Sequence, residues 1–438
     1  MLFSLDVRRA RKGDCFLLHF GSKNEPGLVM IDGGPKSVYK PHLEPRLKAI
    51  KAARGLATED PLQVDLLMVS HVDDDHIQGI LDLTKEEITA KQAHQPQLLN
   101  VLSLWHNSFD EIIGHEPKEL MASVKTQFGA ASVAGGELPD DARREVEERS
   151  AEDPEVVVST LKVLASIEQG FRLRQDAEGL GWARNPEVGG KLVIAREGGK
   201  AIAIGQGLTL TVVGPMQPEL NALHQKHEEW LEELKKKGKS PPEALAAYVD
   251  KSVPNLSSIV VLAECDGKRI LLTGDARGDK ILEGLQLVGL LEPGKKSKME
   301  VDVLKVPHHG SSNNLDDDFF ERIIAKHYVF SGNGEHGNPE REALEMLISA
   351  RGEEPYLIHL TYPIDEIDAG READWNKERD KQIARKKKSP GTKVREKWSP
   401  QKQSLAALFE KHEAVGRKIK IVDSTKPHLI DLLDPVKF

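Results

Sequence analysis

The chain has 438 residues, 39% of them hydrophobic and 30% charged, which suits a globular protein with a large core and excludes a disordered or fibrous chain. Its net charge of -9, from 61 basic and 70 acidic residues, excludes attraction of nucleic acid by the molecule as a whole. No apolar run has the length of a membrane span, no signal-peptide pattern opens the sequence, and Cys15 and Cys265 lie in apolar segments, so we expect a cytoplasmic protein with no membrane partner and no disulfide.

The N-terminal segments predict the start of a β-sheet. Leu2–Val7 and Cys15–Phe20 have the composition of a hairpin, and Leu28–Ile31 predicts a third strand that ends at Asp32 in a glycine-containing turn. A helix is expected over His42–Arg54.

A short buried strand followed by metal-ligand residue types is the main feature of the sequence. The apolar run Leu66–Val69 is followed within a few positions by His71, Asp73, Asp74, Asp75 and His76. Adjacent carboxylates repel one another and are costly to desolvate, so this group favours a metal site at the carboxyl end of the strand over the alternative, a solvated acidic turn. Helical spacing of apolar residues predicts a helix that starts near His76.

The middle of the chain predicts helical insertions. Leu98–Leu104 is an expected strand, and acidic, helix-forming segments follow at about 108–185 and again at 218–250. Between them, Leu208–Gly214 resumes the strand pattern of the core.

Two later strands repeat the pattern of an apolar run that ends in ligand residues. Arg269–Asp275 ends in Asp275, and Val301–Gly310 ends in the pair His308 and His309. Three strands are therefore expected to deliver ligands to one place.

These motifs resemble those of metallo-beta-lactamase-fold hydrolases, and more closely the ComEC-type metallo-hydrolase domain. The matching segments, in the same order, are Leu5-Asp6-Val7, Gly13-Asp14-Cys15, Met30 to Gly34, His71 to His76, Leu271 to Asp275, and Val306 to Ser311. The resemblance implies a four-layer αββα sandwich over residues 1–364 with the helical insertions, and leaves 365–438 as a charged C-terminal extension ending in a strand at Lys418–Val422. It also implies that Asp32 braces the ligand loop without binding metal.

The resemblance further implies two divalent metal ions. His71 and Asp73 would hold one ion, Asp75, His76 and either His308 or His309 the other, and Asp275 would bridge them. Which of these two histidines binds metal stays open; we place His308 with the metal ligands and His309, with Asp75 and Asp275, with the catalytic residues. Asp74 is expected to face away.

Two departures from the family pattern affect the expected metal. Asp73 stands where the family has histidine, and Asn255 and Ser257 occupy the region of a further histidine that is missing. Fewer imidazoles favour Mn²⁺ or Mg²⁺, with Zn²⁺ as the alternative. His106 is one candidate to replace the missing ligand.

Polar residues near the motifs are candidate substrate contacts. They are Ser311, Ser312, Asn255 and Asn338, where Asn338 stands in place of a family histidine and His336 is a candidate to compensate. The basic stretch Lys381–Lys397 predicts either a solvated surface or contact with a phosphate backbone.

The sequence therefore favours a metal-dependent phosphodiesterase or nuclease acting on DNA, with single-stranded DNA suggested by the association of ComEC-type proteins with strand degradation during uptake. One alternative is a hydrolase of a small ester, lactone or amide. The other is a partner-binding module that has lost catalysis, with no protein partner indicated.

Overall fold

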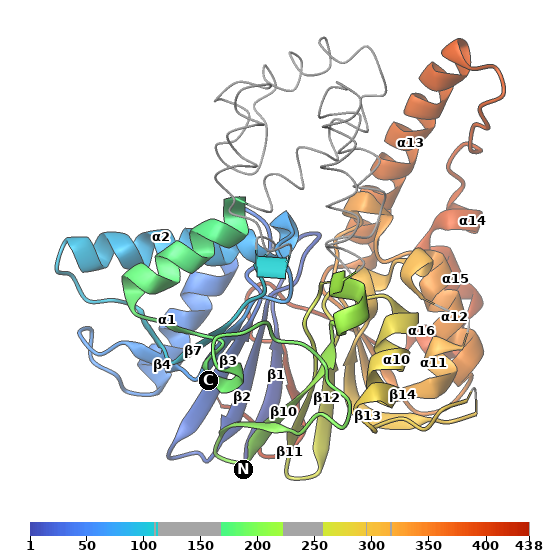
Figure 1. Ribbon diagram of the computed structural model, residues 1–438. Coiled ribbons are helices and arrows are strands. Elements are labelled where there is room, and N and C mark those ends of the chain that lie inside the picture. The colour runs from blue at the N-terminus through green and yellow to red at the C-terminus, as the bar shows by residue number, and fades with distance from the viewer. Residues whose placement is uncertain (109–110, 113–167, 222–256, 295, 316–317, 438) are drawn as a thin grey trace.

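Two β-sheets packed face to face form the centre of the molecule. The computed structural model describes residues 1–108, 111–112, 168–221, 257–294, 296–315 and 318–437 (Figure 1). Within these residues, one sheet has seven strands in the order β17-β1-β2-β3-β5-β7-β8, and the other has eight in the order β16-β15-β14-β13-β12-β11-β10-β9.

The first sheet contains β1 (Leu2–Val7), β2 (Phe16–Gly21), β3 (Pro26–Ile31), β5 (Leu66–Met68), β7 (Ser103–Trp105), β8 (Ala183–Arg184) and β17 (Leu429–Asp431). The second contains β9 (Ile202–Gly205), β10 (Leu208–Gly214), β11 (Val260–Cys265), β12 (Lys268–Leu272), β13 (Met299–Lys305), β14 (Ile323–Phe330), β15 (Leu357–Leu360) and β16 (Ile419–Ile421). A separate parallel pair consists of β4 (Leu62–Val64) and β6 (Leu99–Val101).

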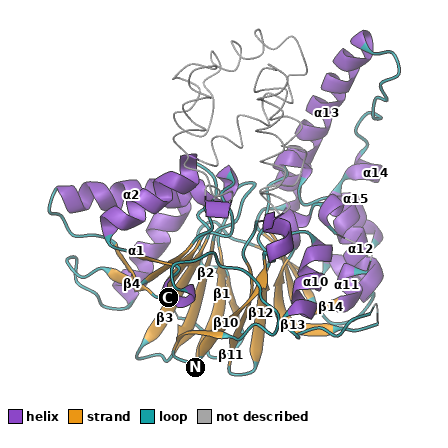
Figure 2. Ribbon diagram, viewed as in Figure 1, coloured by secondary structure: helices purple, strands orange, loops and turns teal. Residues whose placement is uncertain are grey.

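Helices cover the outer face of each sheet (Figure 2). The first sheet is covered by α1 (Glu44–Ala53) and α2 (Asp74–Gln92), and the second by α10 (Gly278–Leu287), α11 (Phe319–Arg322), α12 (Arg341–Arg351) and α15 (Leu405–Lys411). The other C-terminal helices are α13 (Ile364–Lys388), α14 (Pro400–Gln403) and α16 (Glu413–Gly416).

Three apolar cores separate the four layers. Side chains alternate between the two faces of a strand, so Val261 and Ala263 of β11 join the core between the sheets, whereas Leu262 joins the core under the outer helices. A third core joins Leu67 of β5 to Ile77 and other residues of the first helical layer. The predicted αββα sandwich is confirmed.

Parallel strands bring the predicted ligand segments to one edge of the sandwich. β3 and β5 are parallel, as are β12, β13 and β14, so their carboxyl ends lie at the same edge of each sheet. β2 runs antiparallel to β3, with Phe16 opposite Ile31, so the residues that precede β2 also lie there. Chain reversals far apart in sequence therefore meet above the core.

A close contact between two glycines fixes α2 against the turn after β3. A Cβ on Gly79 would lie 1.9 Å from the carbonyl oxygen of Gly33, and a Cβ on Gly33 would lie 2.5 Å from the backbone nitrogen of Ile80. Only residues without a side chain permit this approach, which places Asp32 beside the first turn of the helix.

The structure corrects two sequence expectations. The strand expected at Leu98–Leu104 is two strands, β6 and β7, in different sheets, with the exposed Leu102 between them. Lys418–Val422 contains β16 but is not the last strand, because β17 follows and pairs with β1. The C-terminal residues thus add a strand to each sheet.

Most residues of the two predicted helical insertions lie outside the described residues. Asn255, which follows the second insertion, also lies outside them. The described residues 168–221 contain β8, which belongs to the first sheet, and β10, which belongs to the second. The division of the chain at residue 364 stays a prediction. None of the helices within the described ranges has the length and apolar character needed to cross a bilayer.

Candidate metal centre

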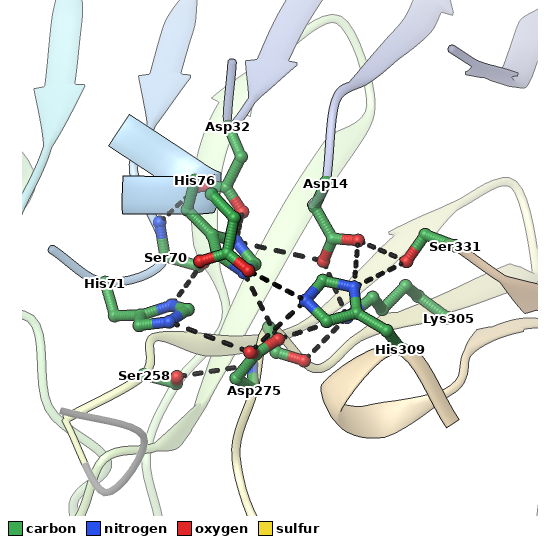
Figure 3. Close-up of polar contacts among 12 residues, drawn as sticks. Asp14, Asp32, Ser70, His71, His76, Ser258, Asp275, Lys305, His309 and Ser331 are labelled. Carbon is green, nitrogen blue, oxygen red and sulfur yellow. Dashed lines mark hydrogen bonds and ion pairs between the residues drawn. The ribbon is translucent and has the colours of Figure 1, made fainter. Parts of the chain in front are cut away.

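Imidazoles and carboxylates from both sheets converge at the shared edge (Figure 3). The Asp275 carboxylate lies at the centre: one oxygen is 3.3 Å from His76 Nε2, and the other is 3.3 Å from His309 Nε2 and 3.8 Å from His71 Nε2. Among the described residues, the groups of three ligands whose atoms lie within 4.8 Å of one another are His71–His76–Asp275, Asp75–His76–His309, Asp14–Asp32–His76 and Asp14–Asp275–His309.

Four polar atoms in this cluster are buried without a hydrogen-bond partner. They are His71 Nε2, His76 Nε2, His309 Nε2 and Asp275 Oδ1. Leaving such atoms unpaired is costly, and a divalent cation is the group that satisfies imidazole nitrogens and carboxylate oxygens together. The donor set therefore fits a metal centre.

Asp32 fixes the orientation of His76. Its Oδ2 lies 2.8 Å from His76 Nδ1 and accepts a hydrogen bond from Ser70 Oγ at 2.7 Å, while Oδ1 accepts from the Ser70 backbone N–H at 2.7 Å. With its Nδ1 directed to a carboxylate, His76 presents Nε2 to the cluster. A carboxylate behind a histidine in this way is typical of metal-binding histidines.

Of the two adjacent histidines after β13, His309 is the one inside the cluster. His308 and His309 both have left-handed backbone conformations, with φ of 46° and 54°, which are uncommon outside glycine and often mark functional turns. The His309 side chain is 2% exposed, whereas that of His308 is 28% exposed with its Nε2 3.6 Å from Asp275. The geometry favours His309 as a ligand and places His308 at the rim.

Three residues of the cluster were not predicted from the sequence. Lys305 is fully buried at the end of β13, with its Nζ 2.6 Å from Asp14 Oδ2 and 2.8 Å from the carbonyl of Gly274. Asp14 also approaches His309 Nδ1 at 3.3 Å and accepts a short hydrogen bond from Ser331 Oγ. A lysine directly before the Val306-Pro307-His308-His309 motif and the Gly13-Asp14 motif were the available sequence signals.

The buried histidines of the cluster differ in pKa, and therefore in charge, in the metal-free protein. Burial and the neighbouring charge of His76 lower the pKa of His71 to about 3, so its imidazole is neutral near pH 7. Burial opposes protonation of His309, but Asp275 and Asp14 raise its pKa to about 9. The pKa of His76 is also raised, because Asp275 and Asp32 outweigh its burial. A binding cation has to displace these protons.

Two predicted carboxylate ligands lie at the edge of the cluster. Asp73 precedes α2, and its Oδ2 is 3.8 Å from His71 Nε2; Asp75 Oδ2 is 3.8 Å from His309 Nε2. Asp74 instead accepts a hydrogen bond from Gln169 at 3.0 Å and belongs to none of the ligand groups among the described residues.

The candidate substrate residues differ in their surroundings, and the candidate replacement ligand His106 is directed elsewhere. Ser312 binds Glu340 through its backbone N–H and its hydroxyl, and Ser311 is buried next to it. The Asn338 side chain is buried, and its Oδ1 has no hydrogen-bond partner in the described structure. His106 directs Nε2 to the carbonyl of Gly170 at 3.3 Å and is in none of the ligand groups found among the described residues, so nothing in this geometry makes it a replacement ligand.

Comparison with known proteins finds similarity over limited segments. No family model matches the chain. A segment of 117 residues, 26% of the chain, is 30% identical to microtubule-associated protein 1A of Rattus norvegicus, and a segment of 100 residues, 22% of the chain, is 33% identical to ComE operon protein 3 of Bacillus subtilis (strain 168). These matches span 4% and 12% of the two relatives' lengths. The second similarity and the His/Asp clusters are compatible with a metal-dependent hydrolase.

Proposed function

We propose that the chain is a metal-dependent phosphodiesterase that hydrolyses DNA, with single-stranded DNA as its preferred form. The observation that carries the proposal is the convergence of His71, His76, His309 and Asp275 with four buried ligand atoms that have no hydrogen-bond partner. Divalent ions at such a site, when bound, acidify a water and stabilise charge on an attacked phosphoryl oxygen.

The residues behind the ligands keep the site rigid. Asp32 directs His76, while Asp14 and Ser331 lie against His309 Nδ1 and direct that ring. The buried ammonium of Lys305 holds Asp14 in place and supplies positive charge 3.6 Å from Asp275. Rigid support of this kind keeps ligands in productive geometry without rearrangement during a reaction.

The balance of donors supports Mn²⁺ or Mg²⁺ over Zn²⁺. Asp73, Asp75 and Asp275 supply as many carboxylates as His71, His76 and His309 supply imidazoles, and oxygen donors suit hard cations. We propose two ions, which would be held by His71, Asp73, Asp75, His76, His309 and Asp275, and we assign Asp75, Asp275 and His309 to catalysis.

DNA is favoured as substrate by the motif resemblance to ComEC-type hydrolases, and the short similarity to ComE operon protein 3 is compatible with that resemblance. Hydrolysis of a small ester, lactone or amide is the alternative within the same chemistry. A non-catalytic partner-binding module is the other alternative, and similarity to a protein named for microtubule association supports it. Against it, a module without metal has no use for four buried ligand atoms that make no hydrogen bond.

The test combines metal content with a substrate panel. Asp75→Ala together with Asp275→Ala should abolish bound metal, measured by elemental analysis, and hydrolysis of a single-stranded oligonucleotide. The matched control Glu59→Ala/Asp60→Ala removes two exposed carboxylates and should change neither. Metal content equal to that of the wild type in the Asp75/Asp275 variant would refute the site, and turnover of lactones but not of any phosphodiester would refute the substrate class.

A further inference from the structure

Helix α13 projects from the sandwich on the side where the strand ends carry the metal cluster (Figure 1). Its base is fixed against the 333–338 loop: a Cβ on Gly334 would lie 2.1 Å from the carbonyl oxygen of Ile367, and Arg371 donates to the carbonyls of Gly337 and Gln403. The helix has 25 residues, and its C-terminal half extends beyond the body of the protein. The base of α13 is thus held against this loop, and its C-terminal half forms an arm.

The arm is strongly basic although the protein is acidic. Residues 375–398 contain ten Lys and Arg against three Asp and Glu, a net charge of +7 in a chain with a net charge of -9. Exposed lysines on this segment are Lys377, Lys381, Lys386, Lys387, Lys393 and Lys397. Beyond Trp375 the helix has only Ile383 and Ala384 as apolar residues, so it lacks the apolar stripe by which a surface helix usually packs.

Two tryptophans lie among these charges. The rings of Trp375 on α13 and Trp398 on the returning segment are 5.9 Å apart and inclined by 70°. The Arg395 guanidinium lies 4.6 Å from the Trp375 ring, and the Arg371 guanidinium lies 5.6 Å from the Trp398 ring. Trp375 Nε1 also donates to the carbonyl of Glu396 at 2.9 Å, so the returning segment is held against the helix. Both tryptophans remain partly exposed.

A chain of contacts joins the base of the arm to the cluster. Arg371 binds Gly337, and the neighbouring His336 lies with its Nε2 3.3 Å from Lys12 Nζ. Two residues after Lys12, the backbone N–H of Asp14 donates to the carbonyl of Asp75. His336 and Lys12 therefore lie between the base of the arm and the ligand loop, and the charge of Lys12 acts on Asp75.

We propose that α13 and the returning segment 389–398 form a docking arm for single-stranded nucleic acid and guide the strand toward the metal cluster. This inference rests on the proposed function and names the form of its substrate. Exposed lysines contact phosphates, while indole rings stacked with guanidinium groups offer surfaces for unpaired bases. A duplex keeps its bases stacked inside and cannot use the tryptophans. A membrane surface would require an apolar helix face, which α13 lacks.

Binding is measured without turnover, on the full chain in EDTA, by fluorescence anisotropy of a labelled oligothymidylate of about 20 nucleotides. Trp375→Leu should weaken binding about tenfold, and Trp375→Phe, which keeps an aromatic ring beside Arg395, should retain most of it. Lys386→Gln/Lys387→Gln should lower the slope of log K against log salt by about 1.4, since each lost phosphate contact contributes ~0.7 on a single strand. The matched control is Lys48→Gln/Lys51→Gln on α1, at the opposite side of the molecule, which should leave affinity and slope unchanged.

The outcomes separate this inference from the proposed function. Weaker oligonucleotide binding with unchanged hydrolysis of a small chromogenic phosphodiester supports the arm. If only the lysine variant loses affinity, and duplex binds as well as single strand, the stacking role of the tryptophans is overturned. If all variants bind the oligonucleotide with equal affinity, the proposed docking arm is overturned. Binding to phosphatidylserine vesicles in place of oligonucleotide also overturns it. If the wild type hydrolyses no phosphodiester yet needs Trp375 and the lysines to bind oligonucleotide, the arm stands and the proposed hydrolysis fails.

Discussion

Replacing Asp32 with asparagine tests whether the carboxylate behind His76 prepares that histidine for metal. Asp32 Oδ1 accepts the Ser70 backbone N–H at 2.7 Å, and this donor will keep the oxygen of an amide on that side. The amide nitrogen then faces His76 Nδ1, which lies 2.8 Å from Oδ2 in the wild type. A donor at this position favours the tautomer with the proton on Nε2, the atom that has to be free to bind a cation.

The expected effect is a loss of metal affinity without loss of fold. Removing such a supporting carboxylate typically weakens metal binding 10- to 100-fold, or about 1.4–2.7 kcal/mol. Burial raises the pKa of Asp32 even though the charge of His76 opposes this. The ionised form of Asp32 is therefore less favoured in the fold than in the unfolded chain, but Asp32→Asn also removes a charge partner of protonated His76. These two effects oppose each other, so the Tm of the metal-free protein should change little.

Competition with a metallochromic chelator for Mn²⁺ measures the affinity, and thermal melting in EDTA measures the fold. The matched control is Asp302→Asn, also a buried aspartate, whose partners Arg269 and Lys326 lie outside the ligand groups. It should bind Mn²⁺ as the wild type does. Wild-type affinity in Asp32→Asn would refute the role assigned to Asp32, and a fall in Tm together with affinity would assign it to folding instead.

Three other predictions address charge in the same cluster. Lys305→Met should destabilise the metal-free protein by about 3–5 kcal/mol, because it removes the buried ammonium that pairs with the Asp14 carboxylate. Chemical denaturation measures this loss, and added Mn²⁺ should recover part of it. The pKa of His309 is raised to about 9 from an ordinary 6.5, so its protonation stabilises the metal-free fold. This stabilisation is fully present below pH 6.5 and is lost as the pH rises to 9, so the Tm in EDTA should fall across that interval. A saturating divalent ion should reduce the fall. Mn²⁺ or Mg²⁺ should restore hydrolysis to the metal-free protein better than Zn²⁺, because Asp73 stands in place of an imidazole; restoration by zinc alone would point to an unrecognised nitrogen ligand.

The sequence predicted the strands and the edge at which the ligands meet because both depend on local patterns. Alternation and apolar runs identified β1, β5 and β10, and Leu208–Gly214 has the predicted bounds. Since parallel strands present their carboxyl ends together, the positions of the ligand motifs followed from the order of the strands. The break between β6 and β7 was missed because a single exposed leucine inside an apolar run resembles a continuous strand.

Pairings across the sandwich could not be predicted in this way. Whether His308 or His309 enters the cluster depends on two successive left-handed residues, which the sequence Pro-His-His-Gly does not specify. The contacts of Lys305 with Asp14, which are 291 positions apart in the chain, depend on both sheets closing. Only the placement of a lysine at the end of β13, directly before the ligand motif, could have indicated such a partner.

The pattern of paired and unpaired atoms shows which residues support the site and which face an incoming ligand. His76 and His309 each direct Nδ1 to an oxygen, of Asp32 in one case and of Ser331 and Asp14 in the other, and leave Nε2 without a hydrogen bond. A buried histidine with a purely structural role would tend to have hydrogen-bond partners at both ring nitrogens. Support on one nitrogen of each ring, with the other directed at Asp275, is the arrangement that binding a cation requires. Asp14 belongs to the supporting set because Lys305, Ser331 and His309 already occupy its oxygens, whereas both oxygens of Asp275 lie 3.3 Å from a histidine Nε2 and would be available to a bound cation.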